Sequence, residues 1–282
     1  MEPTAEDARA EAREDAAEEL HDACYVYGIV ALSDTGHDAE STVGQLPAVG
    51  GDPEARVEFV RHGDIAAAVS SLSTDRPLGR PEDLRAHAGV LNPLAASGAP
   101  VLPFRFGTVV ADTRAVTDDV LARGHDTFVK ALQRLKGRAQ FTLRAVYEQD
   151  SVLREVLRER PDIVELRETV AGLPEDAAYY ERVRLGELVA ESLAMRQQKD
   201  TEDIERQLSP LADALVVSSA PAAEDAVADI SLLVSDDRRA EFERTANDMA
   251  RRWHGRIRMR LLGPLAPYDF VAEAMEGSEG VP

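Results

Sequence analysis

The run Gly263-Pro264-Leu265-Ala266-Pro267-Tyr268-Asp269-Phe270 lies near the C-terminus, directly after an alternating strand pattern over residues 256–262. Proline fixes φ and lacks a backbone N–H, so the two prolines predict that the strand ends here and the chain turns away. The turn would hold the rings of Tyr268 and Phe270 in place. It is either a buried turn that packs both rings over the end of a sheet, or an exposed surface on which another protein docks.

Two further runs combine strand-forming residues with aromatic rings. Residues 25–30 read Tyr-Val-Tyr-Gly-Ile-Val, and residues 102–108 read Leu-Pro-Phe-Arg-Phe-Gly-Thr. Arg105 is the one charge in the second run. It either pairs with a carboxylate and fixes the end of the strand, or binds an anionic group of a partner, since guanidinium suits bidentate contacts with carboxylates.

Taken together, the three runs resemble the GvpL/GvpF family of gas vesicle proteins, whose C-terminal signature reads Gly-Pro-Trp-Pro-Pro-Tyr-Asn-Phe. The resemblance covers roughly residues 23–272, with the runs in family order. Leu265, Ala266 and Asp269 depart from the signature. The residues that the resemblance marks as family-motif or structural positions are Leu102, Pro103, Arg105, Phe106, Gly107, Thr108, Gly263, Pro264, Pro267, Tyr268 and Phe270.

Composition limits the class of protein. A chain of 282 residues is long for one core, so two domains are expected. The net charge of −20 argues against binding to nucleic acid or to anionic membrane surfaces. The single Cys24 excludes an internal disulfide and a cysteine metal cage. There is neither a long apolar run nor a secretion signal, so the sequence predicts a cytoplasmic protein.

The first half predicts an acidic tail followed by an α/β domain. Residues 1–22 carry nine acidic side chains and no apolar stripe, which indicates a disordered tail. Residues 23–137 form the expected N-terminal domain, an α/β sandwich with helices packed on a mixed sheet. Its expected elements are strands over 24–32, 56–61 and 64–71, a helix over 81–96, a strand over 99–102 and a helix over 113–135. The pair His62-Gly63 fits a two-residue hairpin turn.

The second half predicts a ferredoxin-like domain over residues 138–272, with 273–282 as a tail. Its expected elements are strands over 141–147, 212–219, 226–235 and 256–262, a helix over 236–253, and two inserted helices over 151–171 and 174–208. The alternation in the last strand, together with the apolar stripe from Phe242 to Trp253 on the helix before it, predicts that Ile257, Met259 and Leu261 share a core with Met249. The runs over 102–108 and 263–270 then fall in different domains, and we expect both to lie near the domain interface. Phe104 or Phe106 on one side and Tyr268 or Phe270 on the other should be largely buried, and Arg105 should pair with an acid.

The inserted helices are longer than a strand can cover. A helix over 174–208 would reach about 50 Å, against about 20 Å for a strand. The pair forms either an antiparallel helical arm, with residues 196–203 as a solvated portion, or one kinked helix on the sheet. Leu185, Leu188 and Val189 lie on one stripe of this segment and are candidate partner-binding residues.

A search for catalytic and metal-binding patterns finds none. The six histidines stand apart without zinc-ligand spacing, and no nucleophile motif accompanies them. We therefore expect neither an enzyme nor a bound cofactor. The resemblance implies a minor gas vesicle component or assembly factor that binds the hydrophobic shell protein and limits its aggregation during vesicle nucleation. Other gas vesicle accessory proteins are further implied partners. The alternatives are a small-ligand-binding or enzymatic α/β domain, and an oligomerisation scaffold.

Overall fold

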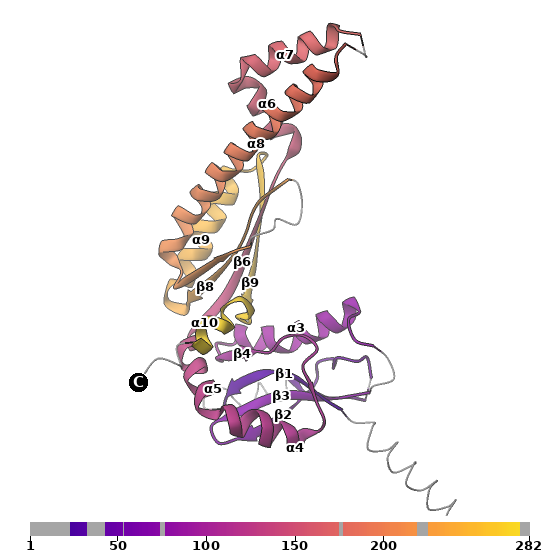
Figure 1. Ribbon diagram of the computed structural model, residues 1–282. Coiled ribbons are helices and arrows are strands. Elements are labelled where there is room, and N and C mark those ends of the chain that lie inside the picture. Colours follow the sequence, from indigo (N-terminus) through magenta and orange to yellow (C-terminus); the bar gives the residue numbers. More distant parts are fainter. Residues whose placement is uncertain are drawn as a thin grey trace, which may run out of the picture. The chain divides into compact units, whose positions relative to one another are not determined.

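The computed structural model describes residues 23–32, 43–52, 54–73, 77–174, 177–218 and 225–276; the predicted acidic tail over residues 1–22 lies outside them. It is a mixed α/β protein with two antiparallel sheets, in two compact units (Figure 1). The first unit contains the described residues up to Gln140 and those from Gly263 onward, and the second is Phe141–Leu262. The chain passes between them twice, within β6 (Arg138–Tyr147) and β9 (Ile257–Leu265).

The sheet of the first unit is built around one strand. Its strands are β1 (Ala23–Ala31), β2 (Glu58–His62), β3 (Ile65–Leu72), β4 (Val101–Pro103) and β5 (Val109–Val110). Their order is β2-β3-β1-β4, with β5 also paired to β1, and each pairing is antiparallel. The expectation of a mixed sheet is wrong, because every pair of hydrogen-bonded strands in this sheet is antiparallel. β3 and β4 run in the same direction, but β1 lies between them.

Helices complete the first unit. They are α3 (Pro81–Ala96), α4 (Thr113–Ala115), a π-helical segment η1 (Val116–Leu121) and α5 (Ala122–Leu135). The last three form the helix expected over 113–135. Helix α3 begins with a proline and two acids in its first turn, as its sequence predicts. Its buried face packs on Tyr25, Tyr27, Ala66 and Ala68, which belong to the hydrophobic core of this unit.

The hairpin between β2 and β3 turns one residue later than expected. His62 still pairs with Ile65, so the two turn residues are Gly63 and Asp64. Gly63 has φ of +61°, a backbone conformation that only glycine adopts at little cost. A turn with glycine at its first central position matches the right-handed twist of the flanking strands.

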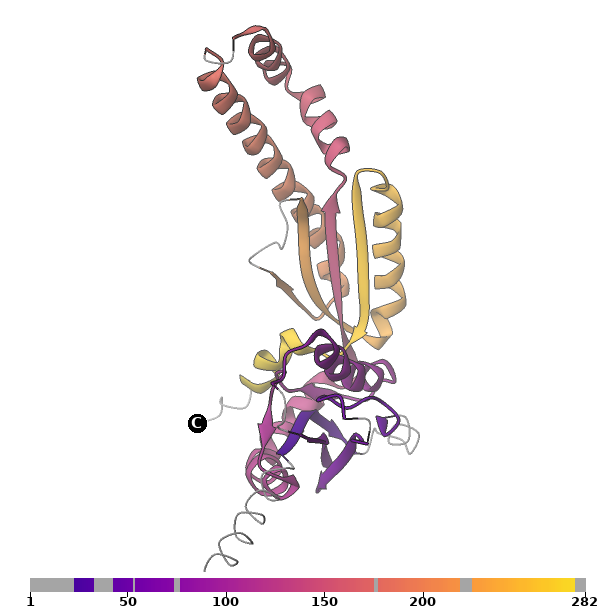
Figure 2. The same ribbon diagram turned by 90° about the vertical axis from the view of Figure 1, so that its right-hand side faces the viewer.

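The second unit has a four-stranded sheet with the order β7-β8-β6-β9. β7 is Ala214–Val217 and β8 is Ala226–Ser235; α9 (Asp236–Arg252) and the C-terminal part of α8 (Tyr179–Leu208) cover one face (Figures 1 and 2). The core contains the Phe141 and Phe242 rings, whose centroids lie 5.1 Å apart.

The core expected around the last strand forms only in part. Ile257 and Met249 are fully buried, as the alternating pattern predicted. Met259 and Leu261 are only half-buried, because β9 is an edge strand of its sheet.

Three helices are inserted between β6 and β7, and we call them the helical arm: α6 (Gln149–Glu159), α7 (Pro161–Gly172) and α8. The single helix expected over 151–171 is interrupted at Arg160, whose non-helical backbone reflects the proline that follows it. Helix α8 begins at Tyr179 rather than residue 174. A short 3-10 turn, η2 (Ser209–Leu211), leads from α8 towards β7.

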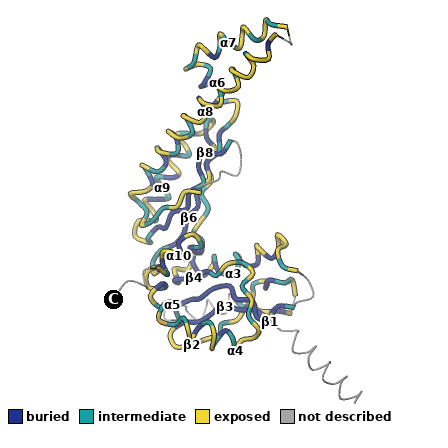
Figure 3. The backbone as a smooth tube through the Cα atoms, in the orientation of Figure 1, coloured by how far each residue is buried: buried dark blue, intermediate teal, exposed yellow. Residues whose placement is uncertain are grey.

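The solvated portion of the arm is not where the sequence placed it. Most of α7 and the adjoining part of α8 are exposed, whereas residues 196–203 contact other elements of the second unit (Figure 3). Asp200 is only 5% exposed. The charges in this stretch are therefore partly buried and paired.

The C-terminal segment belongs to the first unit. After β9, which runs through Gly263 and Pro264 to Leu265, come a 3-10 turn η3 (Tyr268–Phe270) and α10 (Val271–Glu276). Residues 263–272 therefore do not continue the second domain, in contrast to the expected boundary. Residues 273–276 are the end of α10 rather than a tail, and Ala274 is buried.

Candidate functional site

The three aromatic runs converge on one buried histidine of α3. His87 is 4% exposed, and the rings of Tyr25, Tyr27, Phe106 and Tyr268 have centroids 5.7–5.8 Å from its own. We call these five residues the motif junction. Because β1, the β4–β5 connection, α3 and the C-terminal segment each contribute to it, the junction links the ends of the first unit's sequence.

A chain of hydrogen bonds orders the junction. The Gly107 N–H donates to the Tyr25 hydroxyl over 3.1 Å, and that hydroxyl lies 2.9 Å from His87 Nδ1. If the hydroxyl donates to Nδ1, the His87 proton is on Nε2. Gly107 has φ of +88°, so glycine allows the loop to bring its N–H to this position.

Tyr27 connects the junction to the loop before β2 and to the sheet. Its hydroxyl accepts from the Val49 N–H over 2.8 Å and lies 3.1 Å from Ser70 Oγ. Burial raises the pKa of Tyr27, and burial likewise raises the pKa of Tyr25 to about 12. Both phenols are therefore neutral hydrogen-bonding groups at physiological pH.

Two polar atoms in the junction are buried without a hydrogen-bond partner in the described chain, His87 Nε2 and the Tyr268 hydroxyl oxygen. Burial lowers the pKa of His87, with a weaker opposing contribution from the backbone of Phe104. Burial also raises the pKa of Tyr268. The junction thus favours a neutral imidazole at His87.

Three side chains of the first unit hold the C-terminal segment. Asn92 Oδ1 accepts from the Ala266 N–H over 3.0 Å. Gln140 makes two hydrogen bonds to Asp269, its amide N–H₂ donating to the carboxylate over 2.7 Å and its Oε1 accepting from the backbone N–H over 3.1 Å. An Arg134 guanidinium N–H donates to the Ala274 carbonyl over 2.6 Å.

The first and second runs also meet through the backbone. β4 pairs with β1 so that Pro103 faces Gly28 and Leu102 faces Ile29. A Cβ at Gly28 would lie 2.6 Å from the Leu102 carbonyl oxygen, so a larger residue would push the strands apart. The close approach explains the glycine at this position.

The remaining motif residues differ in burial. Leu102, Pro103, Pro267 and Phe270 are buried, whereas Pro264, Phe104, Phe106, Thr108 and Tyr268 are intermediate and Gly263, Gly107 and Arg105 are exposed. Both long runs lie in the first unit, so the expectation that they approach one another from different domains is wrong. Arg105 forms no ion pair within the described chain, and the expected acidic partner is not found there.

A second polar cluster fixes the base of the helical arm. Arg256 donates to Glu155 over 2.9 Å and to Asp200 over 2.6 Å, and the Tyr147 hydroxyl donates to the same Asp200 carboxylate over 2.5 Å. Arg196 pairs with Glu155 and Glu159. Burial opposes the charge of Arg256, but the two carboxylates outweigh it and raise its pKa. This arginine cluster joins α6 and α8 to the start of β9.

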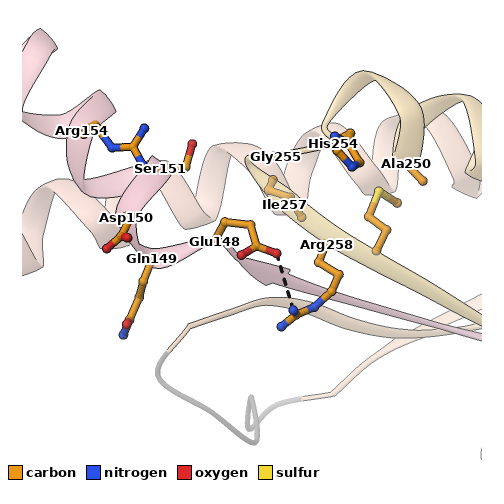
Figure 4. Close-up of a pocket in the computed structure, with 11 residues that line it drawn as sticks. Glu148, Gln149, Asp150, Ser151, Arg154, Ala250, His254, Gly255, Ile257 and Arg258 are labelled. Atoms are coloured by element: carbon orange, nitrogen blue, oxygen red, sulfur yellow. Dashed lines mark ion pairs between the residues drawn. The ribbon is translucent and has the colours of Figure 1, made fainter.

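A cavity of the second unit lies beside α6. It measures about 780 Å³ and is lined from the first turn of α6, the end of α9 and β9 (Figure 4). Figure 4 shows Glu148 and Arg258 pointing toward one another, and their charged atoms are 3.5 Å apart. Arg154 comes from α6, and His254 from the turn after α9. The pocket holds no hydrogen-bonded nucleophile and base among its described lining residues.

No group of three or more histidine, cysteine or acidic side chains in the described ranges could hold a metal ion. Within those ranges, each helix is too short or too polar to cross a bilayer.

Sequence comparison decides the family. The model of the family described as gas vesicle synthesis protein GvpL/GvpF matches residues 23–272. The chain belongs to the GvpL/GvpF family of gas vesicle proteins. It is 34% identical over 250 residues to gas vesicle protein F of Streptomyces sp. (strain CB03234), covering 88% of this chain and 98% of that protein. Its relatives thus carry the names of gas vesicle proteins, and its role is gas vesicle-related.

Further relatives extend the match. Gas vesicle protein L of the same Streptomyces strain is 36% identical over 112 residues, which is 36% of this chain and 40% of that protein. Among solved structures, gas vesicle protein GvpF from Anabaena sp. PCC7120 has a TM-score of 0.69 at 22% identity, covering 89% of this chain and 98% of that one. At 22% identity this structural likeness shows only that the two chains share the same mixed α/β fold.

Sequence reasoning found the three runs but missed their centre. No motif in the sequence singles out His87, Asn92 or Gln140 as a site residue. One signal was present: His87 lies one helical turn before Val90 and Leu91 and two turns before Leu94, on the buried face of α3.

Proposed function

We propose that this chain is a gas vesicle assembly protein that binds the hydrophobic shell protein and limits its aggregation during vesicle nucleation. The observation that carries the proposal is the family match over residues 23–272. The same match supports action at the gas vesicle together with other accessory proteins.

The physical properties of the chain suit an apolar client. A protein that holds an aggregation-prone partner needs a surface that resists self-association and a limited apolar area for docking. The net charge of −20 makes copies of the chain repel one another and so opposes self-association. The exposed large apolar residues provide this docking area, and two of them, Tyr179 and Val183, lie on one face of α8.

The candidate partner-binding residues are reassigned in this proposal. Leu185, Leu188 and Val189 are half-buried on the side of α8 that also carries the buried Ser192. We propose that they support the arm, and that Tyr179 and Val183 of the same helix meet the partner.

Two structural assignments form part of the proposal. The strand order β7-β8-β6-β9 and the succession strand, helices, two strands, helix, strand support a ferredoxin-like second domain with the helical arm as its insertion. The eleven motif residues are assigned a structural role, because they build the motif junction or anchor the segments that enter it.

The competing functions make different predictions. An enzyme or ligand-binding domain needs a pocket with convergent polar groups and perturbed titrations. The 780 Å³ pocket has instead one exposed ion pair between Glu148 and Arg258. An oligomerisation scaffold would use the arm to contact a second copy, which a sedimentation measurement detects.

Co-purification tests the proposal. The tagged full chain is expressed together with the shell protein and captured, and an unrelated acidic protein with the same tag is the matched control. We expect the shell protein to elute with the chain and not with the control. Equal recovery from both would show that the capture is nonspecific and would contradict the proposal.

A further inference from the structure

Helix α8 is longer than the sheet that it packs on, and one of its faces carries mainly apolar and small residues, interrupted by Gln197 and Thr201. Near its C-terminal end this face contacts the sheet: Ile204 and Leu208 are fully buried, and Thr201 and Gln197 donate to the Val227 and Ala226 carbonyls over 2.7 Å. Ala226 begins β8, so the sheet ends at this level.

Beyond the sheet the same face of α8 continues, and no other element within the described residues covers it. At helical spacing it carries Tyr179, Val183, Gly186, Ala190, Leu193 and Ala194. Tyr179 is 65% and Val183 is 46% exposed. We call this stretch the open face; its 16 residues span about 24 Å.

A groove lies at the lower end of the open face. It has a volume of about 320 Å³ and runs between α6 and α8, where Val152 and Leu153 of α6 meet Ala190, Leu193 and Ala194 of α8. Leu153 is 39% exposed, although it is a large apolar residue. The groove and the open face therefore form one apolar surface, continuous with the packing of α8 on β8.

The shape of this surface suits a helix. Gly186, Ala190 and Ala194 recur every four residues, so a helix axis can approach α8 closely along this line. Its length of about 24 Å matches four to five helical turns. A flat sheet would not enter the groove between two helices.

Charge decides between a foreign helix and a second copy of the chain. Glu187 lies on α8 beside one edge of the open face and Arg182 beside the other, and Asp225 lines the groove, so acids outnumber bases around this surface. Two copies placed face to face would bring these acids together in a chain that already carries −20. A helix with basic residues beside its apolar stripe would complement them.

We propose that the open face and the α6–α8 groove bind one amphipathic helix of a partner, with basic residues flanking its apolar stripe. The inference rests on the proposed function only for the partner's identity, which would be the shell protein. It assigns recognition to α8 and α6, and not to the motif junction.

The experiment uses the full chain with two substitutions on one helix. Ala190→Lys places a bulky charge in the groove at an exposed position and keeps the helix. Met195→Lys is the matched control, since Met195 is 56% exposed on α8 but lies outside the open face. Two probes are titrated: the shell protein, and a labelled 18-residue helical peptide with a leucine–alanine stripe and lysine flanks.

We expect Ala190→Lys to weaken binding of both probes at least tenfold, with Met195→Lys within twofold of the unchanged chain. A peptide with glutamate flanks should bind at least fivefold more weakly than the lysine peptide. Sedimentation of each variant reports self-association.

The outcomes separate this inference from the proposed function. If the shell protein binds but Ala190→Lys has no effect, the open face is not its site and the inference is wrong, whereas the proposed function stands. If only the peptide binds, and does so through Ala190, the groove is a helix site and the proposed function fails. A dimer that Ala190→Lys abolishes would assign the face to a second copy and overturn the inference.

Discussion

At the scale of single residues, the first unit is organised by a neutral buried histidine. His87 is in contact with rings from all three sequence runs, and its Nδ1 is bonded to the Tyr25 hydroxyl. A second proton on Nδ1 would remove the acceptor of that hydroxyl and place a charge among aromatic rings. Burial accordingly lowers the pKa of His87. Protonation therefore opposes the folded state of the first unit.

This predicts a stability that falls in mild acid. The unfolded chain protonates His87 near pH 6.5, its ordinary value, whereas the folded chain does so only at lower pH. The free energy of unfolding is therefore highest above pH 6.5. It falls as pH decreases from 6.5 to the folded pKa of His87, by up to about 1.4 kcal/mol per pH unit. Urea unfolding followed by far-UV circular dichroism at pH 7, 6 and 5 measures the slope.

The variant His87→Gln should be less stable at pH 7 and show a shallower slope between pH 7 and 5. The exposed His254→Gln serves as the control and should keep the original slope. An unchanged slope in His87→Gln would show that the junction does not depend on a neutral imidazole.

At the scale of elements, the helical arm is held to the sheet by buried charge. Arg256 lies at the start of β9 and bonds to carboxylates from α6 and α8, one of which is almost inaccessible to water. Breaking such a group by removing one partner leaves an uncompensated charge, at a typical cost of about 3–5 kcal/mol. An exposed ion pair such as Arg258–Glu148 contributes about 0–1 kcal/mol.

The matched substitutions Arg256→Met and Arg258→Met, two residues apart in and beside one strand, separate these effects. We expect Arg256→Met to destabilise the second unit by about 3 kcal/mol and Arg258→Met by less than about 1 kcal/mol. Fluorescence of Trp253, the single tryptophan, reports on this unit during urea unfolding. Equal effects of the two substitutions would contradict the role of the arginine cluster.

How far the sequence predicts these elements depends on what each residue contacts. Alternation placed Ile257 and Met249 in the core, but it carries no information on strand order, so the edge position that exposes Met259 was not foreseen. The proline at 161 marked a helix boundary that periodicity alone passed over. The burial of Asp200 follows from partners on β6 and β9, which are far away in sequence.

At the scale of the whole molecule, the two units are interleaved in sequence. The chain enters the second unit at Phe141 and returns to the first at Gly263. Sequence reasoning placed the first crossing within a few residues, because a glycine-marked helix end precedes it. It missed the second, because the rings of Tyr268 and Phe270 gave no indication of which core they enter.

Family membership, net charge and the exposed face of α8 support the central proposal that this chain keeps the shell protein from aggregating. The most direct measurement is light scattering after the shell protein is diluted out of denaturant, with and without the chain. At equimolar concentration we predict several-fold lower scattering than with an unrelated acidic protein at the same concentration. Scattering equal to that of the acidic control would contradict the claim.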